Sequence, residues 1–353
     1  MKTTRDPGLD LIRASAMTAV FAVHFFLNSE FYEVPSGGWA MTLGIVVRTQ
    51  LMVCVPLFLI LTGWLQKDRT WSWSYYRGIG ALLMTYVLAS LFCAVFRALF
   101  LGGSWSPVAW LRDLLLFRLA PYGWYIALYL GLFLLIPFLN VAWREVRSKR
   151  ARQCLVLTVA VLSFGPSLNV LSMHFGWQMA LPGWEQLYPV AYYFLGNYLR
   201  DEPPKCNWKW FLLLDLAAVL AGGLLHAYQA KGEPFGFFAL TYWNGFFTAL
   251  AATSVFQLLR SCPFARAPQR VREVVSRVAA LSLPAFLLSW IPDQIAYGLL
   301  NQLVPSMVQR FPWGLVTVPF VLLASILLSL LLNGVQRGLW RMLSGGRKVT
   351  LSL

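Results

Sequence analysis

Long apolar runs, separated by short polar or basic segments, recur along the whole chain. A hydrocarbon core about 30 Å thick is crossed by about 20 residues of helix, and most of the runs approach that length. Ten runs are present, near residues 9–28, 44–65, 79–101, 123–142, 154–172, 186–199, 210–228, 236–259, 278–300 and 313–336. The pattern predicts an all-α protein, a polytopic transmembrane helix bundle of about ten spans that forms a single transmembrane domain over residues 1–353.

The positions of Lys and Arg predict how this bundle is oriented. Positively charged residues are enriched in the cytoplasmic loops of membrane proteins. If the spans alternate from an inside N-terminus, 22 of the 29 Lys and Arg residues fall in inside segments and 4 in outside segments. Only Arg13, Arg48 and Arg97 lie within spans. We therefore expect both termini to be cytoplasmic.

The composition of the chain indicates which kinds of molecule it is expected to bind. The chain is 58% hydrophobic and 12% charged, whereas soluble domains carry about 25% charged residues. Its net charge of +15 comes from basic loops along one membrane face, which attract anionic lipid head groups and small cytosolic anions. We therefore expect membrane lipid as a partner and no nucleic acid. The five cysteines show no metal-ligand spacing, so no metal site is predicted.

The first span contains three ionisable residues on one face. Arg13 and His24 are eleven positions apart, which is about three helical turns, so they share a face to within ~20° and lie ~16 Å apart along the axis. Asp10 lies one turn before Arg13 and joins this face. Ionisable groups inside a membrane helix cost free energy, so they are expected to line a protein interior and to serve a function there.

An Arg and a His with ten residues between them in the first span resemble the signature of the acyltransferase family 3 membrane proteins. Three further stretches are similar to patterns of that family: VPLFLILTGWL at 55–65, GWYIALY at 123–129 with LIP at 135–137, and YYFLGNYL at 192–199. In length the chain resembles the short, stand-alone O-acetyltransferase members.

Two positions depart from the family pattern. Ser289 stands in the ninth span where members often have a His, and Met52 stands one turn before the second-span proline where many have an Arg. Arg48 lies one further turn back, on roughly the same face. These departures bear on acceptor or acyl specificity more than on the class of reaction.

The resemblance implies transfer of an acyl group, above all acetyl, from cytoplasmic acyl-CoA to a hydroxyl of a cell-surface glycan or its lipid-linked precursor. It implies a multi-pass protein of the bacterial cytoplasmic (inner) membrane, with acyl-CoA as co-substrate and no permanently bound cofactor. His24 is then the catalytic residue, either as a general base or through an acyl-imidazole intermediate. Arg13, with Asp10 beside it near the inner surface, is the expected donor-binding residue.

Five other ionisable residues are candidates for binding the acceptor or the developing oxyanion. Arg48, Arg97 and Asp293 lie in the outer halves of their spans, and Glu30 and Glu33 follow the first span on the outer side. Arg48, Arg97 and Asp293 are also explained as interfacial anchors or as parts of structural ion pairs. Glu30 and Glu33 are equally explained as part of an interfacial aromatic belt.

A transporter or flippase for a glycan or small anion is the competing function. Charged residues within spans are common in that class too. The sequence shows no inverted repeat and no matched pair of broken helices, which are typical of many transporters. Release of free CoA thiol in the presence of acyl-CoA and acceptor would distinguish the enzyme from the transporter.

Overall fold

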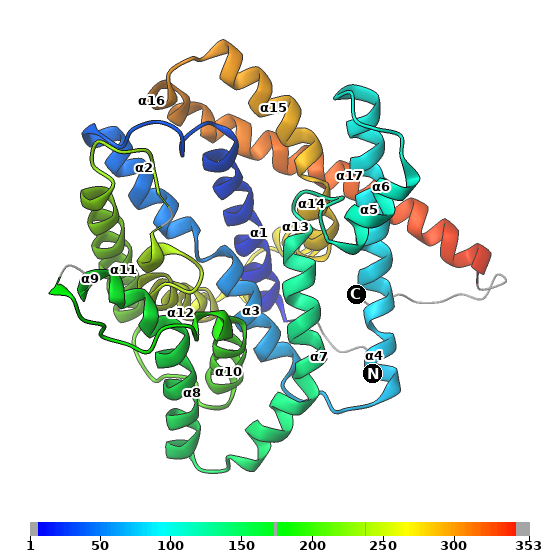
Figure 1. Cartoon of the computed structure of the whole chain (residues 1–353). Helices are drawn as coiled ribbons and strands as arrows, with labels where there is room; N and C mark the ends of the chain where they lie inside the picture. Colours follow the sequence, from blue (N-terminus) through cyan, green and yellow to red (C-terminus); the bar gives the residue numbers. More distant parts are fainter. Residues whose placement is uncertain (1–5, 173–174, 237, 344–353) are drawn as a thin grey trace.

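The computed structural model describes residues 6–172, 175–236 and 238–343, with side chains up to residue 339, and these residues form a bundle of helices (Figure 1). Seven helical stretches are long and apolar enough to cross a membrane. They are Pro7–Asn28, Gly38–Gln66, Trp73–Phe100, Trp124–Glu145, Lys149–Ser172, Trp208–Gln229 and Met307–Leu339. The protein is therefore a polytopic helical membrane protein, and the predicted fold class is confirmed.

The other three predicted spans are shorter or divided helices. They are α10 (Tyr188–Asp201), α12 (Phe246–Ser261), and the series α13 (Gln269–Ala280), α14 (Ser282–Leu288) and α15 (Trp290–Leu303). Proline explains the divisions in that series, because it lacks an N–H and its ring clashes with the carbonyl four residues earlier. Pro284 and Pro292 each stand in the first turn after a break. The total of ten spans stays a prediction.

Helix α1 (Pro7–Asn28) occupies the middle of the bundle (Figure 1). It begins at a favourable N-terminus, with Pro in the first turn and the Asp6 carboxylate accepting a hydrogen bond from the Gly8 N–H at 2.8 Å. It packs against α3, α12, α13 and α17 (Gly314–Leu343). Asp10 and His24 of the first span are buried inside protein, as the cost of exposing them to lipid requires, and Arg13 is partly buried.

The second span is broken into α2 (Gly38–Leu51) and α3 (Cys54–Gln66). Pro56 lies in the first turn of α3 and cannot donate to the carbonyl of Met52, so the chain turns at that point instead of continuing one helix. Arg48 lies in the last turn of α2, just before this break, and is buried.

Two motif glycines let α3 and α10 cross with their backbones in contact. A Cβ atom on Gly63 would collide with the carbonyl oxygen of Tyr193, and one on Gly196 would collide with that of Ile60. Only glycine permits such an approach without moving a helix. The glycines in the stretches 55–65 and 192–199 therefore have a packing role.

The remaining elements complete the bundle. They are α4 (Trp73–Arg77), α5 (Ile79–Phe100), α6 (Pro107–Leu115), α7 (Trp124–Glu145), α8 (Lys149–Phe164), α9 (Asn169–Ser172), α11 (Trp208–Gln229) and α16 (Met307–Arg310), with 3₁₀ turns at Gly165–Leu168, Glu185–Leu187, Ala239–Thr241, Phe264–Arg266 and Phe311–Trp313. Pro137 inside α7 leaves the carbonyl of Phe133 without its helical donor. The Tyr75 hydroxyl donates to that carbonyl at 2.8 Å, which fixes α4 against α7.

A charged cluster joins four helices at the end of the bundle that is predicted to be cytoplasmic. The Asp201 carboxylate pairs with Lys67 and Arg152 and accepts a hydrogen bond from the Trp143 indole at 3.0 Å. These residues belong to α7, α8, α10 and the end of α3, so the cluster holds this end of the bundle together.

Candidate functional site

His24 lies in the last two turns of α1 and contacts a carboxylate from the far end of the chain. Its Nδ1 atom is 3.1 Å from Oδ2 of Asp293 on α15, although 269 positions separate the two residues. Asp293 has no exposed surface, and His24 is 6% exposed. The structure thus brings together the predicted catalytic residue and one of the predicted acceptor or oxyanion candidates.

Tyr122, just before α7, is a member of the same cluster that the sequence analysis missed. Its hydroxyl donates to Oδ2 of Asp293 at 2.7 Å, and its ring centroid lies 4.0 Å from that of His24. Burial and the Asp293 carboxylate raise the pKa of the Tyr122 phenol well above its usual value, so it stays a hydrogen-bond donor. The only sequence signal for Tyr122 is that it precedes the stretch 123–129.

These hydrogen bonds favour one tautomer of His24. A carboxylate is acceptor-only, so the nitrogen that faces Asp293 is the one that carries the proton. The Nε2 atom then has a free lone pair and can accept a proton. The Ser289 hydroxyl donates to the Phe286 carbonyl at 2.9 Å and lies 3.4 Å from Nδ1 of His24. Ser289, which stands where family members often have a second His, is therefore adjacent to His24.

A cavity of about 160 Å³ adjoins His24. Its lining residues are Val20, Val23, His24, Leu27, Tyr32, Arg48, Met52, Cys54, Val55, Tyr122, Trp124, Tyr242, Trp243 and Phe286. Trp124 and Trp243 stack in its wall with ring centroids 4.4 Å apart. The cavity is mostly aromatic and apolar, and electrostatic interactions are stronger in such surroundings than in bulk water.

Among the residues that the structure describes, Arg48 is the only Lys, Arg, Asp or Glu that lines this cavity. It is 2% exposed, its Nε atom donates to the Tyr32 hydroxyl at 2.8 Å, and its guanidinium carbon lies 4.6 Å from the ring centroid of Phe235. Tyr32 follows α1 and Phe235 follows α11, so both belong to connections predicted to face outside. The structure therefore brings a second predicted candidate to the same cavity as His24.

Arg13 and Asp10 lie at the other end of α1. Nη1 of Arg13 is 3.4 Å from Oδ1 of Asp10, the Arg13 side chain is 23% exposed, and neither residue lines the His24 cavity. Because α1 is one continuous helix, Arg13 and His24 keep the separation of ~16 Å expected from their spacing. Tyr125 and Tyr129 of α7 lie close enough to Arg13 to experience its charge.

The structure places the other three candidates elsewhere. The Arg97 guanidinium lies 5.0 Å over the ring of Trp290, and Arg97 does not line the cavity. Glu30 pairs with the buried Arg310 at 2.7 Å, and Arg310 also donates to the Ser29 carbonyl at 2.7 Å, so Glu30 belongs to a structural cluster at the end of α1. Glu33 is exposed and likewise lies outside the cavity lining.

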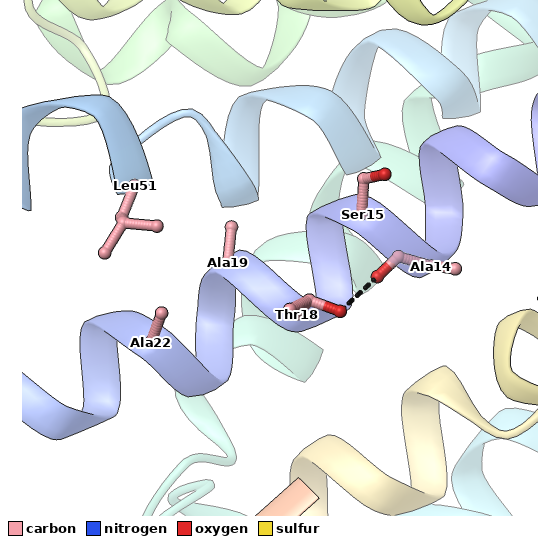
Figure 2. A pocket seen from close by; sticks show the side chains of 6 residues that line it. All are labelled: Ala14, Ser15, Thr18, Ala19, Ala22 and Leu51. Atoms are coloured by element: carbon pink, nitrogen blue, oxygen red, sulfur yellow. Dashed lines mark hydrogen bonds between the residues drawn. The ribbon is translucent and has the colours of Figure 1, made fainter. Parts of the chain in front are cut away.

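A separate groove of about 360 Å³ runs along another face of α1 (Figure 2). It is lined by Ala14, Ser15, Thr18, Ala19, Ala22 and Leu51. The Thr18 hydroxyl donates to the Ala14 carbonyl at 3.0 Å, so the lining offers no charged group and little free polar capacity. Among the described residues there is also no group of three His, Cys, Asp or Glu side chains that could hold a metal ion.

Comparison with protein-family models identifies the family of this chain. The acyltransferase family 3 model, described as an acyltransferase domain, matches residues 6–333. The chain belongs to acyltransferase family 3. This acyltransferase is accordingly a membrane-bound enzyme, and the matched region contains His24, Arg48, Tyr122 and Asp293. Comparison with curated proteins and with solved structures gave no match.

Proposed function

We propose that this acyltransferase transfers an acyl group, acetyl above all, from cytoplasmic acyl-CoA to a hydroxyl of a cell-surface glycan or its lipid-linked precursor. The observation that carries the proposal is the buried His24–Asp293 pair beside an aromatic cavity. A sugar hydroxyl is a weak nucleophile near neutral pH and needs a base to remove its proton. A neutral imidazole with a free Nε2 lone pair provides that base.

The geometry supports the following course of reaction. Nε2 of His24 accepts the hydroxyl proton as the sugar oxygen attacks the thioester carbonyl, and Asp293 stabilises the imidazolium that forms. Collapse of the tetrahedral intermediate breaks the carbon–sulfur bond and releases the CoA thiolate. The imidazolium then returns its proton to the thiolate, so the products are the acyl ester and free CoA thiol. General base catalysis of this kind contributes roughly 10²- to 10⁴-fold.

The donor reaches His24 from the predicted cytoplasmic end of α1. Arg13 lies in the inner part of the helix, where the planar guanidinium can bind a phosphate or amide oxygen of acyl-CoA. The pantetheine arm would then follow the ~16 Å between Arg13 and His24, beside Tyr125 and Tyr129 of α7. Donor and acceptor meet at the cavity from opposite membrane faces.

The experiment that tests this proposal measures free thiol release by the purified protein in nanodiscs with acetyl-CoA and an extracted surface glycan. Mass spectrometry of the glycan identifies the acyl group and the acceptor together. We expect acceptor-dependent thiol release and a matching mass increase on the glycan, both lost in His24→Ala. Thr18→Val, which changes the separate α1 groove, is the matched control and should keep activity. Movement of unmodified glycan across the membrane without thiol release would contradict this proposal and favour transport.

A further inference from the structure

We propose that Arg48 binds a fixed anionic group of the acceptor, a carboxylate or a phosphate located close to the hydroxyl that is acylated. This inference rests on the proposed function, because it concerns the same cavity. It adds the chemical class of the acceptor, which the family match does not specify.

The first observation is that the charge of Arg48 has no carboxylate partner among the described residues. Arg310 is equally buried, at 2% exposure, and it pairs with Glu30 at 2.7 Å. Arg152 is partly buried and pairs with Asp201 at 3.0 Å. A buried cation is costly unless an opposite charge or good hydrogen bonds compensate it. Arg48 therefore differs from Arg310 and Arg152 in a way that an anionic ligand would explain.

The second observation is that the guanidinium of Arg48 is held in a fixed orientation. Its Nε atom donates to Tyr32, and the face of the group packs on Phe235, so its plane is held in place. In the part of the chain that the structure describes, no acceptor is hydrogen-bonded to either Nη atom of Arg48. Two Nη groups held in a fixed plane match the oxygens of a carboxylate or phosphate.

The third observation is the position of Arg48 within the cavity. Tyr32 and Phe235, which hold it, belong to the connections α1–α2 and α11–α12 on the predicted outer side. Arg13, the proposed donor residue, lies near the opposite end of α1. The anion that Arg48 binds therefore belongs to the acceptor. Arg48 would also stabilise an oxyanion, but an oxyanion exists only during turnover. It would leave the charge of Arg48 uncompensated in the resting enzyme.

Two sources supply this anionic chemistry. An acidic sugar carries a carboxylate, and a sugar on a lipid carrier carries a phosphate next to its first ring. Met52, one turn after Arg48, also lines the cavity, so among the described residues this cavity offers one guanidinium and fits a single anionic group.

The experiment measures glycan binding to the protein in nanodiscs without acyl donor. The probes are a uronic-acid oligosaccharide, the same oligosaccharide with its carboxylates reduced to alcohols, and a neutral sugar on a polyprenyl diphosphate. We expect the wild type to bind at least one anionic probe tenfold or more tightly than the reduced one. Arg48→Gln should remove that preference, and Arg97→Gln, a second outer-half arginine stacked on an aromatic ring, should keep it. Arg48→Lys keeps the charge without the planar fork and should retain part of the preference.

The outcomes separate the possibilities. Preference for the uronic-acid probe identifies a carboxylate, and preference for the diphosphate probe identifies a phosphate. Equal binding of all three probes by the wild type overturns the proposal without relying on any variant. A uniform fall in kcat for all acceptors in Arg48→Gln, with unchanged acceptor KM, also overturns it and leaves an oxyanion role. Because binding is measured without donor, failure of acyl transfer would not be confused with failure of this inference.

Discussion

Replacing Asp293 by Asn tests the central contact of the proposed site. The Oδ2 atom of Asp293 accepts hydrogen bonds from both His24 and Tyr122, at 3.1 and 2.7 Å. Asparagine has nearly the same shape, but it lacks the negative charge and presents an NH₂ group. An amide oxygen in the place of Oδ2 still accepts both hydrogen bonds, but these bonds lose their assistance by a negative charge. An NH₂ group in that place leaves both donors without an acceptor, or the imidazole adopts the tautomer that protonates Nε2 and removes the base.

The size of the expected effect follows from these two losses. A hydrogen bond to a charged group is worth about 1.5–3 kcal/mol, which corresponds to roughly 10- to 150-fold in rate at about 1.4 kcal/mol per factor of ten. Complete conversion to the wrong tautomer costs up to ~10⁴-fold in the Ser-His-Asp enzymes. We therefore expect kcat of Asp293→Asn to fall by between about 10-fold and ~10⁴-fold.

The assay is steady-state thiol release in nanodiscs, with acyl-CoA and acceptor varied separately. Asp293→Asn should lower kcat while the affinities for both substrates change little, because Asp293 has no exposed surface and is not among the residues that line the cavity. Asp215→Asn is the matched control, since Asp215 is also a buried carboxylate but pairs with Gln50 and lies outside the cavity lining. Wild-type kcat in Asp293→Asn would refute the role of Asp293, and an equal loss in Asp215→Asn would mean a general effect of removing a buried charge.

Four further predictions follow from the same structure. His24→Ala should abolish acyl transfer but keep acyl-CoA binding by calorimetry; substantial residual turnover would move the base elsewhere. Arg13→Lys should weaken acyl-CoA binding by about 1–3 kcal/mol through loss of a charge-assisted hydrogen bond, with acceptor affinity unchanged, and a defect confined to the acceptor would contradict this. In a variant without the exposed native cysteines, a membrane-impermeant thiol reagent added outside should label a cysteine at Gly232 but not at Lys149; labelling at Lys149 would contradict the ten-span topology. Gly196→Ala should lower the thermal unfolding temperature because its Cβ collides with the Ile60 carbonyl, and unchanged stability would show that α3 can shift.

Local features of the sequence were sufficient to predict the class of fold, and together with the family resemblance they indicated His24 as the candidate catalytic residue. The length of each apolar run is a local property, and a bilayer requires backbone groups to bond within the segment, so such runs become helices. The spacing of Arg13 and His24 predicts one helix face for the same reason, and α1 is a continuous helix through both positions. The breaks before Pro56 and Pro292 also have a local cause, although the sequence analysis treated each span as continuous.

Only the tertiary structure decided which of the remaining polar residues meet at His24. Arg48 and Arg97 look alike in sequence, each an arginine in the outer half of a span, but Arg48 lines the cavity and Arg97 stacks on Trp290. Asp293 and Tyr122 reach His24 from distant parts of the chain. Periodicity specifies which residues share a face of one helix, but which helices pack together depends on the fit of all their surfaces at once. For that reason the sequence could indicate the helix that carries His24 and could offer Asp293 and Arg48 as candidates, but it could not decide that Asp293 and Tyr122 contact His24 and that Arg48 lines the same cavity.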